Sequence, residues 1–221
     1  MVKKIFTIIM LLANVAYMNC MQKEQVEKAQ EELREHIKDL PQDMQAEIAT
    51  YKLKNLLNNY AEDISEKAPG FVYTEAFRGM VPAALLLIQA GANPNVQNKF
   101  GYTLLQLSIQ YNAYETLKYL LKYRGINPNI QDNDGDTALH ILTNKINYSL
   151  MAFGEFFQDE NDLLDMLIAA GARKDIENNQ GKTPYDIIND TLQLNIYDRI
   201  PQQQAQQNKQ RVLELLKPDN Q

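Results

Sequence analysis

The sequence predicts an all-α fold, a solenoid of stacked helix-turn-helix layers with hairpin loops, and two recurring patterns support this prediction. A glycine followed by a small or aliphatic residue and a polar tail recurs at 89–95, 122–129 and 169–175. A second pattern, Gly-x-Thr followed by apolar residues, recurs at 99–107, 133–141 and 179–187. A block of about thirty-odd residues repeated in this way is typical of a stacked array. Such arrays form extended binding surfaces rather than reactive pockets.

Composition narrows the class of protein. The chain has 221 residues, of which 45% are hydrophobic, so it can bury a core in one or two domains. A net charge of −6 argues against a nucleic-acid partner, which needs clustered lysine and arginine. Cys20 is the single cysteine and excludes an intramolecular disulfide, and His36 and His140 are too far apart for a local metal motif. We therefore expect no cofactor and no metal.

Residues 1–20 are predicted to be a signal peptide. Lys3 and Lys4 precede an apolar stretch from Ile5 to Ala13 that is broken only by Thr7. The stretch is shorter than the ~18–20 residues that span a bilayer as a helix. We expect export from a bacterial cytoplasm to the periplasm, the cell envelope or the medium. The alternative is an N-terminal helix packed on the array.

Cys20 leaves two kinds of processing open. It lies just past the apolar stretch, where bacterial lipoproteins carry the cysteine that becomes lipidated. Asn19 and Tyr17 differ from the small and aliphatic residues that usually precede that cysteine. Ordinary signal peptidase would accept Ala16 but is poorly served by Asn14. The sequence is thus compatible with membrane attachment through a lipidated Cys20 and with simple secretion.

Residues 21–69 are predicted to form a helical segment that caps the array. The apolar residues of 22–39 are spaced at three or four, which indicates an amphipathic helix. A second helix is expected from Gln42 to about Tyr60. The residues expected to point toward a core are Met44, Ile48, Tyr51, Leu53, Leu56 and Leu57. Both helices would cover the open apolar end of the first repeat.

The start of the second helix also resembles the opening of an F-box, the adaptor that docks to a ubiquitin-ligase scaffold. The resemblance rests on Leu40-Pro41-Gln42-Asp43-Met44 with Ile48 and Tyr51. A proline just before an amphipathic helix is equally an ordinary helix start. This leaves one alternative function, a secreted effector that recruits a host ubiquitin ligase.

The recurring motifs resemble the ankyrin family, whose consensus joins Gly-x-Thr-Pro-Leu-His to a helix-ending Gly-Ala-Asp-x-Asn. The matching residues are Gly101, Thr103 and Leu105, then Asp132, Gly135, Thr137, Leu139 and His140, then Asn178, Gly181, Thr183 and Pro184. The departures are Leu104, Gln106, Ala138, Tyr185 and Asp186. The resemblance implies an ankyrin repeat domain over 70–217, with repeats at about 70–96, 97–130, 131–176 and 177–217.

Each consensus position has a physical reason. The glycines at 101, 135 and 181 occupy turns that need a positive φ. The threonine that follows caps the first helix of the repeat. His140 is expected to bond neighbouring turns and not to act as a catalytic base, since no nucleophile accompanies it. The leucines expected to fill the layers are 105, 120, 121, 139, 164 and 167.

Three departures from regular spacing are evident. The first repeat, 70–96, keeps Gly79 but lacks Thr-Pro-Leu-His and is expected to be a degenerate start. An insertion at 146–158 carries Tyr148, Leu150, Met151, Phe153, Phe156 and Phe157. Its spacing favours a helix that covers neighbouring repeats over a docking patch. The last repeat is expected to be interrupted at 195–209, before a closing helix with Val212, Leu213, Leu215 and Leu216.

The resemblance implies a non-enzymatic protein-protein interaction module that binds an unidentified protein through its hairpin tips and first helices. The residues at those positions are Lys99, Phe100, Tyr102, Gln110, Tyr111, Asn133, Asp134, Asp136, Asn144, Lys145, Asn179, Gln180 and Lys182. Phe100, Tyr102 and Tyr111 are expected to be the anchors, because aromatic residues dominate interface energies. A structural envelope protein is the alternative. An enzyme is disfavoured because no nucleophile-base pair, metal-ligand spacing or phosphate loop is recognisable.

Overall fold

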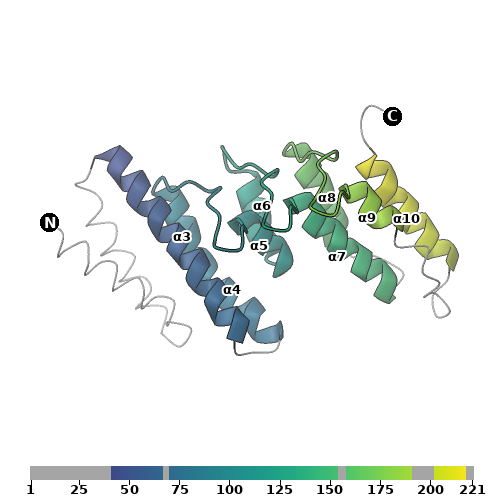
Figure 1. The fold of residues 1–221 in the computed structure, drawn as a ribbon, viewed down its shortest axis with the longest axis horizontal. Helices are drawn as coiled ribbons and strands as arrows, with labels where there is room; N and C mark the ends of the chain where they lie inside the picture. Colours follow the sequence, from purple (N-terminus) through teal and green to yellow (C-terminus); the bar gives the residue numbers. More distant parts are fainter. Residues whose placement is uncertain (1–40, 67–69, 154–157, 191–201, 218–221) are drawn as a thin grey trace. The chain divides into compact units, whose positions relative to one another are not determined.

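The structure is a computed structural model that describes residues 41–66, 70–153, 158–190 and 202–217 (Figure 1). Within these ranges the chain is helical, with turns and loops between the helices and no strand, as the all-α prediction requires. The predicted signal peptide, Cys20 and the helix expected at 22–39 lie outside the described residues. The chain divides into two compact units, residues 1–100 and 101–221.

The first unit contains the helical hairpin of α3 (Gln42–Glu66) and α4 (Gly70–Gln89), which pack against each other. The helix α3 starts directly after Pro41, as predicted, and runs beyond the expected end at Tyr60. Ala49, Leu53 and Leu57 are fully buried at a spacing of four. The unit therefore has its own apolar seam.

Two of the residues expected in this core are exposed instead. Met44 has a relative exposure of 49% and Tyr51 of 58%. The buried stripe follows 49, 53 and 57, and at about 100° per residue Tyr51 lies about 160° from its two nearest members and Met44 about 140° from Ala49. The expectation that Met44 and Tyr51 point inward was therefore wrong.

The degenerate first repeat has a different form from the helix pairs that follow it. The helix α4 is continuous over 20 residues and passes through Gly79 and Pro82. A helical glycine costs about 1 kcal/mol but does not by itself stop a helix. Without the threonine cap and the tight turn of a full repeat, nothing divides this segment into two helices. The helix ends at Gln89, and Gly91 just beyond it has a φ of +95°.

The first unit also holds the loop that follows α4. The hydroxyl of Thr50 accepts a hydrogen bond from the Asn93 amide at 2.8 Å. Asn58 Oδ1 accepts one from the Lys99 amide at 2.7 Å. The helix α3 therefore makes two hydrogen bonds to the loop that ends at the first hairpin tip.

The second unit contains three consecutive helix pairs. They are α5 (Leu104–Gln110) with α6 (Tyr114–Leu121), α7 (Ala138–Phe153) with α8 (Gln158–Ala169), and α9 (Pro184–Asp190) with α10 (Gln202–Leu216). The first helices pack in the order α5, α7, α9, and α6 packs on α8 (Figure 1). Leu105, Leu120, Leu139, Leu164 and Leu167 are buried as predicted, whereas Leu121 is only half-buried.

The insertion at 146–158 lengthens α7. This helix has 16 residues, against 7 in each of α5 and α9, so it is 9 residues longer. Ile146 and Leu150 are buried in the core, whereas Tyr148 has a relative exposure of 70%. Buried Ser149 donates a hydrogen bond to Glu160 of α8 at 3.0 Å. The side chains of 151–159 lie outside the description. The first part of the insertion is thus helical and contributes to the core.

The glutamine tract of the last repeat is also helical, which differs from the interruption expected over 195–209. The helix α10 already begins at Gln202 and continues to Leu216. Glutamine has a good helix propensity, so the tract extends the closing helix rather than a loop. Val212, Leu213 and Leu216 are buried as predicted, and Leu215 is half-buried.

Candidate functional site

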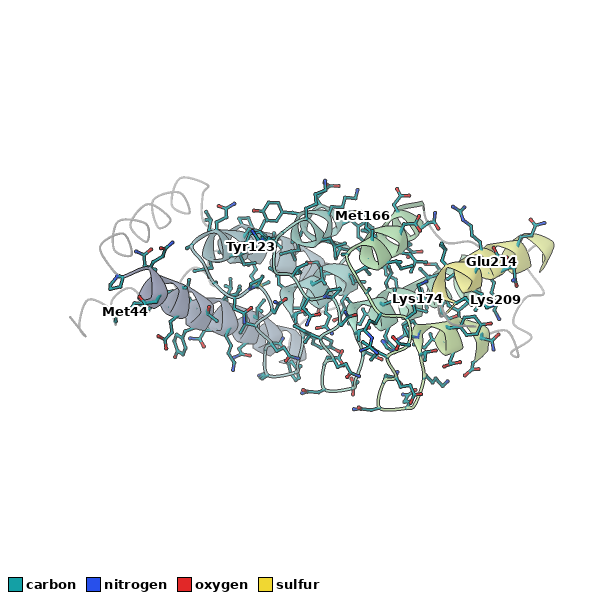
Figure 2. The ribbon with its side chains drawn as sticks, turned by 90° about the horizontal axis from the view of Figure 1, so that it is seen from above. Met44, Tyr123, Met166, Lys174, Lys209 and Glu214 are labelled. Carbon is teal, nitrogen blue, oxygen red and sulfur yellow. The ribbon has the colours of Figure 1, made fainter. Side chains whose placement is uncertain are left out.

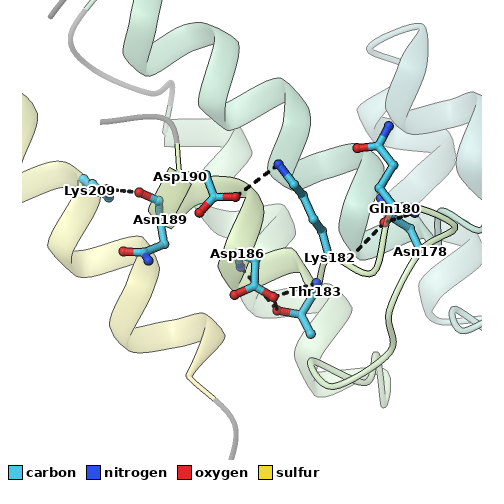
Figure 3. A network of polar contacts seen from close by, with 8 residues as sticks. All are labelled: Asn178, Gln180, Lys182, Thr183, Asp186, Asn189, Asp190 and Lys209. Atoms are coloured by element: carbon cyan, nitrogen blue, oxygen red, sulfur yellow. Dashed lines mark hydrogen bonds and ion pairs between the residues drawn. The ribbon is translucent and has the colours of Figure 1, made fainter. Parts of the chain in front are cut away.

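The hairpins of the second unit share one turn geometry, set by an Asx side chain at their base. Asp132 Oδ1 accepts hydrogen bonds from the amides of Asp134 and Asp136, both at 2.9 Å. Asn178 does the same for Gln180 at 3.0 Å and Lys182 at 3.1 Å (Figure 3). Two backbone hydrogen bonds close each loop: the residue 132 amide donates to the 136 carbonyl and the 135 amide to the 132 carbonyl, both at 3.0 Å, and the 178 and 181 amides donate to the 182 and 178 carbonyls at 3.0 and 2.9 Å. The expected hairpin loops are therefore tight turns that project from the helices (Figure 2).

Consecutive hairpins in this unit are bonded directly to each other. The Asn179 amide donates to the Asp134 carbonyl at 3.0 Å, and its side chain donates to the Asn133 carbonyl at 2.9 Å. A Cβ added to Gly135, whose φ is +78°, would lie 2.6 Å from the Asn179 backbone nitrogen. Glycine is thus required here both for the turn and for the close approach of the next repeat.

A buried histidine links the start of α7 to the hairpin that follows. The Thr137 amide donates to His140 Nδ1 at 3.2 Å, and the Thr137 hydroxyl lies 2.8 Å from the same nitrogen. Because Nδ1 accepts, we assign the ring proton to Nε2, which lies 3.0 Å from the Lys182 carbonyl. His140 is fully buried, and burial lowers its pKa. The structure thus places this imidazole as a neutral connector, the structural role expected of it.

Gln106 and Asp186 occupy the same position in the neighbouring repeats. Gln106 Oε1 accepts from the Thr103 amide at 2.8 Å, and its Nε2 donates to the carbonyls of Asp136 and Ile130 at 2.8 and 3.1 Å. Asp186 accepts from the Thr183 amide at 2.9 Å (Figure 3). An ionised carboxylate has no hydrogen to donate, and within the described residues no further hairpin follows Asp186. Both departures from the consensus histidine therefore suit their places in the array.

The predicted binding residues are all at least partly accessible. Those exposed are Lys99, Phe100, Gln110, Asn133, Asp134, Asn144, Asn179 and Gln180. Those half-buried are Tyr102, Tyr111, Asp136, Lys145 and Lys182. Lys99 and Phe100 belong to the first unit and the other eleven to the second.

Two of the predicted lysines make internal contacts. Lys99 Nζ lies 5.2 Å from the centre of the Phe100 ring. Lys145 Nζ lies 5.7 Å from the Tyr114 ring centre and donates to the Ile109 carbonyl at 3.4 Å. Burial lowers the pKa of Lys145. Lys145 therefore ties α7 to its neighbours, and its ammonium is less available to a partner than the sequence suggested.

Four predicted residues of the second unit line one groove of about 320 Å³. They are Asp136, Asn144, Gln180 and Lys182. The groove also includes Asn147, Asn178, Ile187 and Asp190, which the sequence analysis did not select. Asn147 lies three residues after Asn144 on one helix, a spacing that would have revealed it had the insertion been assigned to α7.

The groove and the adjoining hairpin carry a negative field. Lys182 Nζ pairs with Asp190 Oδ2 at 3.1 Å, and Asn178 Nδ2 donates to Asp136 Oδ1 at 2.8 Å (Figure 3). Burial raises the pKa of Tyr102, and the charges of Asp132, Asp134 and Asp136 raise it further. Burial also raises the pKa of Asp132, against the effect of its backbone hydrogen bonds. Among the residues that line the groove, the charged groups are the two carboxylates of Asp136 and Asp190 and the ammonium of Lys182.

Neither a metal cluster nor a membrane span is found in the part of the chain that the structure describes. No three His, Cys, Asp or Glu side chains among these residues are placed to hold a metal ion. None of the helices in the same ranges is long and apolar enough to cross a bilayer.

Comparison with known proteins agrees with this architecture. Residues 73–152 match the family model described as ankyrin repeats, three copies. No curated protein matches the chain. The match and the helix pairs together define an ankyrin repeat fold, and such repeats serve as protein-protein interaction modules.

The close contact at Gly135 predicts a difference between two glycine substitutions. Gly135→Ala and Gly181→Ala both place a side chain at positive φ, at a cost of about 1–2 kcal/mol. Only the added Cβ at 135 would collide with the next hairpin, because nothing lies within 4 Å of a Cβ at 181. We expect Gly135→Ala to lower the free energy of unfolding by at least about 1 kcal/mol more than Gly181→Ala. Urea unfolding measures this difference, and equal losses would contradict hairpin stacking.

The buried neutral imidazole predicts a pH-dependent stability. The pKa of His140 is lowered in the folded state, so its contribution is present above the ordinary value of about 6.5 and is lost as the pH falls below it. We expect the melting temperature to fall between pH 7.5 and 5.5. The melting temperature of the His140→Gln variant should fall less steeply, because Gln106 shows that glutamine makes equivalent bonds without a titrating group. An equally steep fall in both proteins would exclude His140 as the cause.

Proposed function

We propose that the chain is a non-enzymatic module that binds a protein partner through its hairpin tips and first helices. The observation that carries this proposal is the ankyrin match over 73–152, on repeats whose tips are held by hydrogen bonds and exposed to solvent. Rigid presentation favours binding because little loop entropy is lost when a partner docks. Ankyrin repeats are typically non-catalytic, which favours binding over an enzymatic role.

The proposed contact surface combines aromatic anchors with polar tips. Phe100 is exposed, and Tyr102 and Tyr111 are half-buried, so each can bury further ring surface against a partner. Around Tyr102, the acidic residues Asp134 and Asp136 supply charge that would orient a basic partner surface. The partner itself is unidentified.

Alanine substitution of the anchors tests this surface. A chain with Phe100→Ala, Tyr102→Ala and Tyr111→Ala should lose at least tenfold in affinity for a partner recovered by cross-linking, because truncated interface anchors commonly cost about 2 kcal/mol or more each. The matched control is Tyr119→Ala with Tyr123→Ala, an aromatic pair at 6.5 Å that belongs to the second helix and its end. Calorimetric titration compares the two variants. Equal losses, or an unchanged affinity in the triple variant, would exclude the proposed surface.

We further propose that the protein is exported from a bacterial cytoplasm, on the sequence of residues 1–20 alone. The mature N-terminus is expected near Tyr17 or Cys20. Mass spectrometry of protein from fractionated cells tests this, and an intact Met1 in the cytosol would contradict it. A mass excess equal to acyl chains on Cys20 would establish a lipid anchor, whose hold grows by about 0.8 kcal/mol per buried methylene.

The two alternative functions rest on the sequence alone. The F-box-like stretch at 40–51 lies outside the residues matched by the family model. A specific partner of defined stoichiometry would separate an interaction module from an envelope component.

A further inference from the structure

We infer that the groove between α7, α9 and the last hairpin binds an extended peptide segment bearing a lysine or arginine. The inference rests on the proposed function and specifies the partner chemistry of one part of its surface. The groove lies wholly within the second unit, and half of its eight lining residues were among the predicted binding residues. Its volume of about 320 Å³ suits one or two side chains of a longer ligand.

Three side-chain amides line this groove and make no hydrogen bond within the described part of the chain. Asn144 and Asn147 come from α7, and Gln180 comes from the hairpin tip. None of the three side chains forms a hydrogen bond with another described residue, whereas the amide of Asn178 beside them is engaged with Asp136. Each free amide offers two donor hydrogens and one acceptor oxygen. This is the complement of the alternating carbonyl and N–H groups along an extended peptide backbone.

The charged residues that line the groove favour basic over acidic peptides. The lining contains two carboxylates, Asp136 and Asp190, and one ammonium, that of Lys182. Lys182 pairs with Asp190 through Oδ2, and Asp136 uses Oδ1 to accept from Asn178 (Figure 3). The second oxygen of each carboxylate has no partner among the described residues, and the lining keeps a net charge of −1. An ammonium or guanidinium group can therefore be received, and a glutamate would be repelled.

The groove also has an apolar element that suits a long cationic side chain. Ile187 lines it and is otherwise well buried, at 7% exposure. Lysine and arginine lay their methylene stems along such surface and keep the charged head near polar groups. An anionic ligand would gain only Lys182, already paired, and would oppose two carboxylates. A basic peptide thus complements the amide, charged and apolar parts of the groove.

The test uses fluorescent decapeptide libraries, degenerate in Ala, Ser, Thr and Gly, with the central residue fixed as Lys, Arg or Glu. Fluorescence anisotropy with the full chain should show at least fivefold tighter binding of the Lys and Arg libraries than of the Glu library. In ¹H–¹⁵N spectra the side-chain amide signals of Asn144, Asn147 and Gln180 should shift with the Lys library. Equal binding of the three libraries, or unmoved amide signals, would overturn the inference.

Two variants with matched controls locate the binding. Asn144→Ala should weaken Lys-library binding by about threefold to tenfold, the worth of one hydrogen bond, and Asp190→Asn should reduce the Lys-to-Glu preference. The controls are Gln210→Ala on α10 and Asp165→Asn on α8, exposed residues outside the groove, which should change neither quantity. Melting temperatures confirm folding of all four. Equal effects in variants and controls would exclude the groove.

The failure of this inference can be told apart from failure of the proposed function. Suppose that the aromatic triple variant no longer binds the partner, that Asn144→Ala and Asp190→Asn still bind it normally, and that the libraries show no preference. These results would reject the groove and retain the interaction surface. If the aromatic triple variant binds the partner as tightly as the unaltered protein, the proposed surface itself is rejected, whatever the peptide libraries show.

Discussion

In two of the three full repeats, one buried side chain joins the start of a helix to the backbone around the next hairpin, and the order of the array depends on this bond. It accepts a hydrogen bond from the amide of the capping threonine and donates one to a backbone carbonyl at the following hairpin. His140 does this between Thr137 and Lys182, and Gln106 between Thr103 and the carbonyls of Ile130 and Asp136. A buried polar group without a partner costs about 1–3 kcal/mol, so a misplaced hairpin is penalised. The bonds therefore fix the stacking of successive repeats.

The rigidity that follows from this connection is what makes the hairpin tips usable for recognition. Asp132 and Asn178 hold the turn amides, and Asn179 bonds to the hairpin before it. These inward-facing amides are therefore engaged within the array. What remains for a partner is the outward set of amides, carboxylates and rings, presented on backbone that has little freedom left to lose on binding.

The long helix α7 shows how an insertion can serve both core and surface. Its extra turns bury Ile146 and Leu150, and Ser149 bonds to Glu160 of α8 in the interior. The same turns place Asn147 next to Asn144 on the side that faces the groove. Leu142, Ile146 and Leu150 are buried at a spacing of four, so the extension continues the apolar stripe of the helix and the repeat gains surface without losing packing.

The repeated motifs by themselves determined the fold class, the turn glycines, the threonine caps and the connecting role of His140. These features are local or periodic, and their physical causes lie within a few residues of each other. Sequence periodicity could not decide which side of α3 is buried, and Met44 and Tyr51 were placed inward because several apolar stripes were available to the same helix. The helical form of 146–153 was predicted from its spacing, whereas that of the glutamine tract was missed, since no local signal fixes where an irregular segment joins a helix.

The groove was decided by tertiary structure alone. Asp136, Asn144 and Asp190 come from a hairpin and two helices, and only the packing of α9 on α7 brings them to one hollow. Likewise, the sequence marks Lys145 as a surface cation, but the fold places its ammonium over the Tyr114 ring and against the Ile109 carbonyl. Sequence spacing reports which residues share a face of one element. Which faces pack together, and which charged groups become paired when they do, depends on contacts between residues far apart in the chain.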